Sequence, residues 1–201
     1  MEKYSGYKNY QEYKEKQIER SNKKWGAATV RREMRNCLMK CFEDFKELKT
    51  NPKYIAYMGV RAGYEIDDIQ EQKQYEDSFK FGIEINPKIL EKKNNNVSNI
   101  TYHNYDFTKL PKRWENKFDL IYSNSLDHSF DVKKTLKEWH RVSAKGCFIG
   151  LSLSTNTKTD EYDCNAFDEG DLSFIDKRIF KILKTEKTDD LIFNLILKVK
   201  K

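Results

Sequence analysis

Two glycines, four residues apart, follow a short apolar segment and precede a predicted helix. The apolar segment is YIAYM, residues 54–58, and the loop after it runs from Gly59 to Gly63. A strand that ends in such a loop presents bare backbone, with the unpaired N–H groups of the next helix, at the carboxyl edge of a sheet. Ligands of open α/β sheets bind at this edge, although two glycines alone would also suit an ordinary turn.

An acidic residue at the end of the next predicted strand gives this loop a chemical meaning. Glu84 lies 25 positions after Gly59, in the segment FGIEINP. An acid about 20 residues after such a loop is placed to accept hydrogen bonds from both hydroxyl groups of a ribose. The neighbouring Phe81 and Ile83 predict a buried strand, which makes a purely structural glutamate the weaker interpretation. Loop and acid together indicate a cofactor that contains adenosine.

The loop departs from the fingerprint of dinucleotide-binding proteins. That fingerprint is G-x-G-x-x-G, whereas here Arg61 replaces the middle glycine and Tyr64 the last. Large side chains at these two positions leave little room for a pyrophosphate. An NAD-dependent oxidoreductase is therefore only the third hypothesis for this chain.

A polar segment, SNSLDH, lies at the end of another predicted strand, residues 117–123. Polar side chains at that place face the same cleft as the glycine loop. His128 could act as a general base toward a bound hydroxyl or amine, with Asp127 either orienting it or acting alone. The alternative is a structural histidine that supports its own loop. No histidine or cysteine spacing indicates a metal site.

Strands and helices alternate through the middle of the chain. The predicted strands are residues 54–58, 79–85, 99–105, 117–123 and 146–154, and the predicted helices are residues 64–77, a short helix from Pro87, and residues 131–142. Such alternation is typical of a parallel sheet with helices on both faces. Residues 176–200 differ, because two apolar segments around a Thr/Asp turn predict an antiparallel hairpin.

The region before the first strand is predicted to be helical. Residues 7–24 mix charged side chains with a narrow tyrosine stripe, and residues 27–49 have apolar side chains at three- and four-residue spacing. We divide the chain into an N-terminal helical extension, residues 1–49, packed on a main domain, residues 50–201. The tyrosine stripe either packs on that domain or forms a lid over the site.

Composition and charge exclude several classes of protein. The 201 residues are 38% hydrophobic and 13% aromatic, which is enough for a folded core. No run reaches the roughly 18 apolar residues of a membrane span, and the polar start lacks a signal-peptide core, so we expect a cytoplasmic protein. Residues 1–49 hold 13 Lys/Arg against 8 Asp/Glu, a local charge of +5 out of +6. This surplus is either a solvated helical surface or a footprint for an anionic partner.

The ordered set of motifs resembles the class I S-adenosylmethionine-dependent methyltransferases. GVRAGYE resembles the first motif of that family, IEINP the second and NYDFTKLP the third. The segment from KFDLIYS to GCFIG resembles its fourth strand, the following helix and its fifth strand. The likeness covers roughly residues 53–155. Ala144 and Cys147 depart from the pattern, in a turn where we expect no effect on the cofactor.

The resemblance implies a Rossmann-like, seven-stranded, mostly parallel sheet with a C-terminal antiparallel hairpin and S-adenosylmethionine as cofactor. Glu84 would bind the ribose, Asp106 would accept from the adenine amine, and Ile85 and Leu126 would enclose the adenine ring. The full set of predicted cofactor contacts is Gly59, Arg61, Gly63, Glu84, Ile85, Asp106, Phe107, Asn124 and Leu126.

The function that follows is methyl transfer from S-adenosylmethionine to an acceptor that is a small molecule or a sugar. The alternative is a non-catalytic methyltransferase-like module that binds nucleic acid or a protein through its basic N-terminus. Nucleic acid is the less favoured partner, because acidic residues such as Glu12 and Glu15 interrupt the lysines of that segment.

Overall fold

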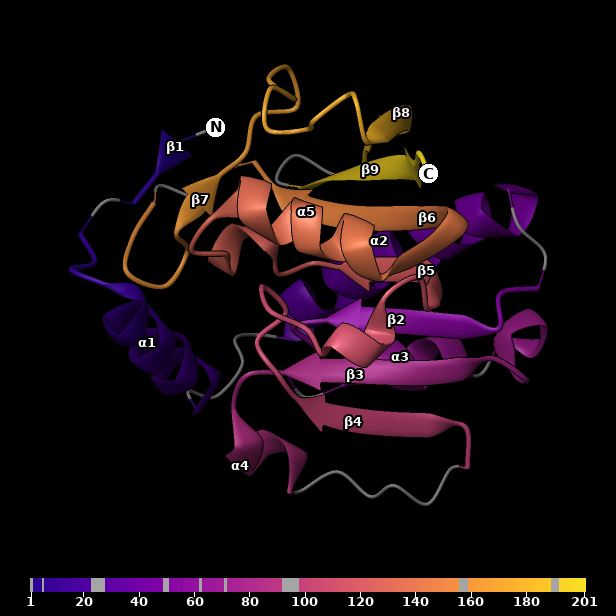
Figure 1. Cartoon of the computed structure of the whole chain (residues 1–201), viewed down its shortest axis with the longest axis horizontal. Helices are drawn as coiled ribbons and strands as arrows, with labels where there is room; N and C mark the ends of the chain where they lie inside the picture. The colour runs from indigo at the N-terminus through magenta and orange to yellow at the C-terminus, as the bar shows by residue number, and fades with distance from the viewer. Residues whose placement is uncertain are drawn as a thin grey trace.

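The computed structural model describes residues 2–4, 6–22, 28–48, 51–61, 63–70, 72–91, 98–155, 159–188 and 192–201. Its centre is a seven-stranded sheet in the order β4-β3-β2-β5-β6-β9-β8 (Figure 1). The strands are β2 (Tyr54–Met58), β3 (Phe79–Glu84), β4 (Ile100–Asn104), β5 (Phe118–Ser123), β6 (Ser143–Ser154), β8 (Phe180–Lys187) and β9 (Ile192–Val199). All seven lie where the hydrophobic pattern predicts strands.

The direction of the strands matches the predicted mixed sheet. Strands β4, β3, β2, β5 and β6 pair in parallel, whereas β9 is antiparallel to both β6 and β8. Chain order reverses between β2, which continues outward to β3, and β5, which lies on the other side of β2. In open α/β sheets, such a reversal leaves a crevice at the carboxyl ends of the strands.

Helices cover both faces of this sheet. On one face, α2 (Ala28–Leu48) and α3 (Tyr64–Gln70) share a buried cluster with β2 and β5, to which α2 contributes Leu38, Phe42 and Phe45. On the other face, α5 (Val132–Val142) buries Leu136 and Trp139. Within the described residues, no helix is both long enough and apolar enough to cross a bilayer.

The other N-terminal helix, α1 (Tyr10–Asn22), does not lie on a face of the sheet. In Figure 1 it lies at the edge toward which the arrowheads of β2, β3 and β4 point. Tyr13, which is 2% exposed, anchors it through ring contacts with Tyr7, Tyr10 and Phe130. The predicted tyrosine stripe therefore packs against the protein, and it does so beside the carboxyl edge.

Two features near α1 and α3 differ from the sequence prediction. The helix predicted over residues 64–77 ends at Gln70, and a short turn, η1 (Lys73–Tyr75), follows it. Tyr75 turns inward there, and its hydroxyl donates to the carbonyl of Phe42 in α2. A small sheet pairs β1 (Glu2–Lys3) with β7 (Asn165–Ala166), and no local pattern had predicted it.

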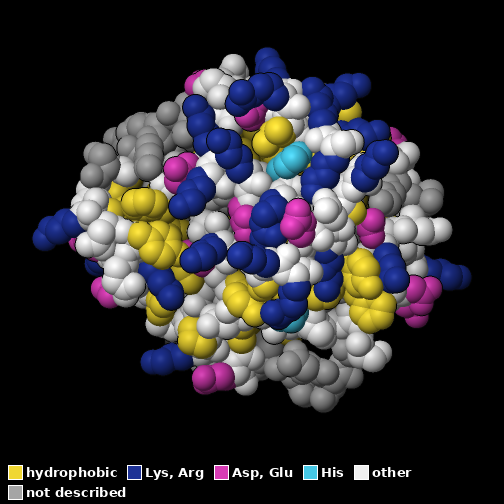
Figure 2. Space-filling model, in the orientation of Figure 1, with side chains coloured by type: hydrophobic (Ala, Val, Ile, Leu, Met, Phe, Trp, Pro, Cys, Tyr) yellow, Lys and Arg dark blue, Asp and Glu magenta, His cyan; other side chains and the backbone are white. Residues whose placement is uncertain are grey.

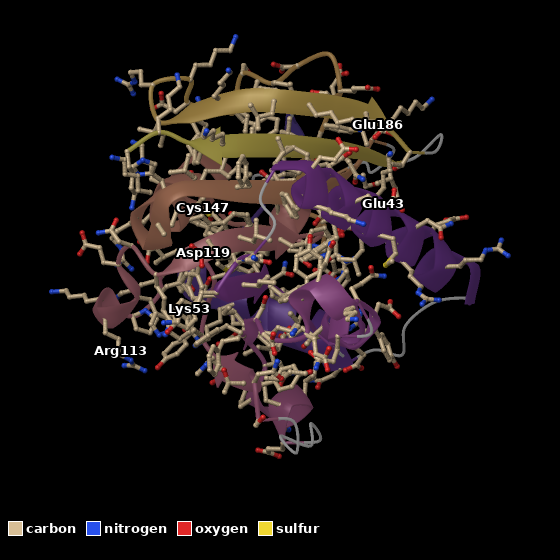
Figure 3. The ribbon with its side chains drawn as sticks, turned by 90° about the vertical axis from the view of Figure 1, so that its right-hand side faces the viewer. Glu43, Lys53, Arg113, Asp119, Cys147 and Glu186 are labelled. Atoms are coloured by element: carbon tan, nitrogen blue, oxygen red, sulfur yellow. The ribbon has the colours of Figure 1, made fainter. Side chains whose placement is uncertain are left out.

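The amino edge of the sheet, turned toward the viewer in Figure 3, is fixed by a side chain. The Asp119 carboxylate of β5 accepts from the backbone N–H groups of Lys53 and Tyr54, at 2.8 and 3.0 Å. Cys147, one of the departures from the family pattern, also lies at this edge. It is therefore far from the carboxyl edge where the sequence predicts the site.

Candidate active site

A cavity of about 570 Å³ lies at the carboxyl edge of the sheet, against α1. Its walls come from the carboxyl ends of β2, β3, β4 and β5 and the residues after them, from α1, and from Asp160, Tyr162 and Asp163, with smaller contributions from α2, α3, β6 and β9. It brings together most of the predicted site residues, namely Gly59, Arg61, Glu84, Ile85, Asp106, Phe107, Asn124, Asp127 and His128. Of the predicted site residues, Gly63 and Leu126 alone do not line it.

Gly59 allows the backbone to pass close to two neighbouring segments. Its φ is +78°, and a Cβ at this position would lie 2.7 Å from the Cβ of Ser125 and 3.3 Å from the ring of Phe107. Its N–H donates to the carbonyl of Ile83 at 2.9 Å, which ties the loop to β3. Any other residue would push the loop away from the cavity wall.

Gly63, which the sequence predicts as a cofactor contact, has a structural role at the start of α3. Its φ is +73°, and its carbonyl accepts from the N–H groups of Ile66 and Asp67 in the first turn of α3. The second glycine of the loop therefore starts the helix and stays outside the cavity.

Glu84 lies at the carboxyl end of β3, and only 4% of the residue's surface is exposed. One oxygen accepts from the N–H of Arg61 at 2.8 Å and the other from the N–H of Asn86 at 3.0 Å. Burial raises the pKa of Glu84, and these two hydrogen bonds oppose that shift. Glu84 thus holds the glycine loop in place and presents its carboxylate to the cavity.

Asp106 offers an acceptor that the protein leaves unused. Its Oδ1 accepts from the N–H of Thr108 at 2.7 Å, whereas Oδ2 is buried and has no hydrogen-bond partner within the described ranges. Burial raises the pKa of this carboxyl. Buried acceptors are normally paired, so an unpaired one that lines a cavity indicates a donor supplied by a ligand.

Phe107 and Leu126 are positioned by the hydrophobic core. The Phe107 ring packs edge-on against Trp139, and its carbonyl accepts from the Trp139 indole at 2.9 Å. Leu126 is fully buried in the short turn η3 (Leu126–His128), with its side chain in the core. Of the two residues predicted to enclose the adenine, Ile85 lines the cavity and Leu126 does not.

Arg61 connects the glycine loop to α1. Its φ is +43°, an unfavourable value for a residue with a Cβ, and its guanidinium donates to the carbonyls of Arg20 and Ser21 at 3.0 and 3.4 Å. The Asn86 amide adds a bond to the Ser21 hydroxyl at 2.7 Å. Arg61 and Asn86, whose N–H groups donate to Glu84, therefore both bind the C-terminal end of α1. Backbone carbonyls at a helix C-terminus lack partners within the helix.

His128 lies within a group of charged residues on the α1 side of the cavity. Its Nδ1 is 3.0 Å from Oδ1 of Asp163, 3.2 Å from the carbonyl of Tyr162 and 3.6 Å from Oδ1 of Asp127. Arg20 also forms an ion pair with Asp163. Asp127 and His128 both line the cavity, and Asp163 lies closer to the imidazole than Asp127 does.

Apart from Tyr13, which belongs to the tyrosine stripe that could form a lid, sequence reasoning missed the residues that α1 and the segment around Asp163 bring to the cavity. Tyr13, Gln17, Arg20 and Ser21 line it, and their spacing places them on one face of the helix. That periodicity is visible in the sequence once the helix is known to lie at an edge. Nothing in the local sequence marks Asp163.

Comparisons with known proteins agree with this geometry. A family model described as a methyltransferase domain matches residues 61–168. Among solved structures, N-methyltransferase NodS from Bradyrhizobium japonicum in complex with S-adenosylhomocysteine has a TM-score of 0.70 at 12% identity, covering 94% of this chain and 99% of its own. None of the curated proteins matched.

Two further structures are similar in fold. A SAM-dependent methyltransferase from Aquifex aeolicus has a TM-score of 0.66 at 14% identity, with 88% of this chain and 100% of that chain covered. The 1,6-didemethyltoxoflavin-N1-methyltransferase of Burkholderia thailandensis has a TM-score of 0.65 at 10% identity, with 90% and 93% covered. Because the family model spans more than half of the sequence, the chain belongs to the methyltransferase domain family, with the class I fold that its motifs predict.

Proposed function

We propose that this enzyme transfers a methyl group from S-adenosylmethionine to a small-molecule or sugar acceptor bound in the cavity under α1. The observation that carries this proposal is the cavity itself. It is lined both by Glu84 and Asp106, which could accept hydrogen bonds from an adenosine, and by His128, which could act as a base. Two of the similar structures contain S-adenosylhomocysteine, and one of these also holds a small-molecule substrate.

The residues on the β2–β4 side of the cavity fit the cofactor. Glu84 would accept from the two ribose hydroxyls, and Oδ2 of Asp106 would accept from the adenine amine and so gain the partner it lacks. The absence of a Cβ at Gly59 keeps the backbone close beneath the sugar and the methionine part. The bound cofactor would supply a methyl group on a sulfonium, which is already a good leaving group.

The chain's own contribution to the chemistry would be positioning, exclusion of water and removal of a proton. The wall formed by α1 shields the cavity, and in-line placement of two reactants can supply much of the rate enhancement. His128 is our candidate for the base, with Asp127 beside it.

The part of the cavity beyond the predicted cofactor contacts has a mixed lining. It includes the polar residues Glu33, Ser152, Ser154 and Asp160 and the apolar or aromatic residues Met34, Ile192, Tyr13 and Tyr162. A total volume of about 570 Å³ must hold both the cofactor and the reactive part of the acceptor. This size favours a small acceptor, or the end of a sugar, over a nucleic-acid duplex.

The basic N-terminus gives little support to the nucleic-acid alternative. In α1, Lys16 pairs with Glu19 and Glu161, both at 3.2 Å, and Arg20 pairs with Asp163. Figure 2 shows Lys and Arg side chains interspersed with Asp and Glu on the face that carries α5. Two of the three cations of α1, Lys16 and Arg20, thus form ion pairs within the protein.

Calorimetric titration tests the proposal directly. S-adenosylhomocysteine should bind with a micromolar Kd, about 8 kcal/mol, and should raise the melting temperature by mass action. NAD, titrated in parallel, should not bind, because Arg61 occupies the place of the middle glycine. A folded sample that shows no thermal shift at millimolar S-adenosylhomocysteine would contradict the proposed function.

The substitution Asp106→Asn separates ligand binding from folding. Asparagine keeps the oxygen that accepts from Thr108 but replaces the unpaired acceptor by an N–H donor, so affinity for S-adenosylhomocysteine should fall about tenfold to a hundredfold. The free energy of unfolding without ligand should not fall at pH 7, because a buried charge is removed.

The pH dependence of stability gives the same substitution a second readout. The native pKa of Asp106 is raised by burial, so the native state binds more protons than the unfolded state between about pH 4 and that raised value. The parent should lose stability as pH rises through this window, and the Asp106→Asn variant should lose less. Urea titrations at several pH values measure both slopes, and unchanged ligand affinity would show that Asp106 does not contact the adenine.

A further inference from the structure

We propose that Asp163 fixes the proton of His128 on Nδ1, so that Nε2 faces the cavity as the base for an acceptor hydroxyl or N–H group. This inference rests on the proposed function and adds to it a positioning residue and an acceptor class. It replaces Asp127, the residue that the sequence suggested, in the orienting role.

The distances around the imidazole carry the assignment. Two oxygens lie within hydrogen-bond distance of Nδ1, namely Asp163 Oδ1 at 3.0 Å and the carbonyl of Tyr162 at 3.2 Å. An unprotonated Nδ1 would place its lone pair against both of these oxygens, one of them a carboxylate, and would accept only from the Arg20 guanidinium, which also lies 3.2 Å away. Because two acceptors face this nitrogen against one donor, we assign the hydrogen to Nδ1. The Oδ1 of Asp127, at 3.6 Å, lies beyond hydrogen-bond distance. The other ring nitrogen, Nε2, makes no hydrogen bond to any residue that the structure describes, and His128 lines the cavity.

Arg20 also contacts this pair of residues. Its guanidinium lies 3.2 Å from Nδ1 and is paired with Asp163, so that carboxylate accepts from both side chains. Burial acts to raise the pKa of Asp163, but the bonds and charges of His128 and Arg20 outweigh it and lower the pKa to about 2. The positive charge of Arg20 therefore balances the charge of the ionised Asp163.

The same cluster brings three possible metal-ligand atoms together, from Asp127, His128 and Asp163, within 4.8 Å of one another. The Arg20 guanidinium already supplies a positive charge at that place. An arginine bonded to the central carboxylate would repel a divalent cation, which favours the proton-transfer assignment.

The segment that carries Asp163 is held from both sides. The Asp160 carboxylate accepts from the N–H groups of Tyr162 and Asp163 at 2.6 and 2.8 Å, which fixes the local turn. The Gln17 amide of α1 donates to the carbonyl of Tyr162 at 3.0 Å. The pairing of β1 with β7 follows directly along the chain. The segment that orients the base is thus held partly by its own turn and partly by the docked N-terminal segment.

The chemistry that follows is a proton transfer coupled to methyl transfer. Nε2 takes the proton of the acceptor while the acceptor lone pair bonds to the methyl carbon and the electron pair of the broken S–C bond returns to sulfur. The resulting imidazolium donates through Nδ1 to Asp163, whose charge stabilises it. A base placed here is needed only by an acceptor atom that must lose a proton, which is a hydroxyl or an N–H group.

The tautomer of His128 tests this inference without knowledge of the acceptor. The chain has three histidines, so ¹⁵N-histidine labelling of the full-length protein gives three imidazoles, and His128→Gln identifies the relevant one. In long-range ¹H–¹⁵N spectra, we expect neutral His128 to carry its hydrogen on Nδ1. A hydrogen on Nε2 in the parent protein would overturn the inference, whatever the variants do.

Two variants distinguish the two aspartates. Asp163→Ala should shift the ratio of the two tautomers toward Nε2–H by about tenfold or more, the value of a hydrogen bond to a charged group. Asp127→Asn should leave the Nδ1–H form in the majority, and the reverse pattern would contradict our assignment. Parent-like S-adenosylhomocysteine binding by Asp163→Ala confirms its fold. If the parent protein binds S-adenosylhomocysteine but carries the hydrogen on Nε2, the inference fails and the proposed function stands. If the parent carries the hydrogen on Nδ1 but does not bind this ligand, the proposed function fails and the positioning role of Asp163 stands.

Discussion

Replacing Glu84 by alanine is expected to lower the affinity for S-adenosylhomocysteine about tenfold to a hundredfold and also to destabilise the protein without ligand. The first effect follows from losing charge-assisted hydrogen bonds to the ribose, worth about 1.5–3 kcal/mol. The second follows from the structure, in which the same carboxylate accepts from the N–H groups of Arg61 and Asn86. Alanine leaves both N–H groups without this partner, at about 1–3 kcal/mol for each that stays buried.

A position at the end of a strand would, from the sequence alone, predict an intact fold after this substitution. Calorimetry and urea unfolding measure the two effects separately. Glu84→Gln serves as the matched variant, since it keeps the shape and one acceptor oxygen, and Glu76→Ala, at an exposed position, serves as the control. Parent-like binding by Glu84→Ala would mean that the ribose contact is misplaced, and parent-like stability would mean that the loop does not depend on it.

Deleting residues 1–49 is expected to give insoluble protein, whereas deleting residues 1–25 should leave a folded one. The longer deletion removes α2, whose side chains Leu38, Phe42 and Phe45 are almost completely buried on the sheet. Burial of each stabilises the fold by about 1.5–3 kcal/mol, and domains are stable by only about 5–15 kcal/mol in total. We propose on this basis that residues 1–49 are a helical extension that the domain of residues 50–201 needs for folding.

The shorter deletion should separate the cofactor from the acceptor. It removes Tyr13, Gln17 and Arg20 from the cavity wall but none of the predicted cofactor contacts. S-adenosylhomocysteine affinity should therefore remain nearly unchanged, while methyl transfer to the true acceptor should be abolished. Solubility after expression, calorimetry and a transfer assay provide the three readouts.

Two results would contradict this picture of the N-terminal segment. Soluble, ligand-binding protein after deletion of residues 1–49 would show that α2 is dispensable. Sub-micromolar binding of RNA or DNA at physiological salt, lost with residues 1–25 and falling steeply as salt rises, would support the nucleic-acid alternative instead.

The sequence by itself determined the sheet, its main helices and most of the residues that line the β2–β4 side of the cavity. Apolar segments predict all seven strands of the sheet, because burial on both faces requires such residues. The periodicity of Leu38, Phe42 and Phe45 predicts α2 for the same reason. Gly59 and Glu84 could be predicted from the sequence. Close approach of the backbone requires a glycine at one place, and the predicted ribose contact requires an acid at another. These constraints act on residues close together in the chain, so they can be recognised from the spacing of residue types in the sequence.

Only the tertiary structure decided where α1 lies, what Arg61 does and which aspartate contacts His128. Arg61 departs from the glycine pattern at a cost in backbone strain, and its reason, the end of α1, lies 40 residues earlier in the chain. Arg20 and Asp163 are 143 residues apart. A few hydrogen bonds and ion pairs join these segments, and such contacts impose no periodicity on either partner. Their residues acquire a function only when folding brings them to the carboxyl edge of the sheet.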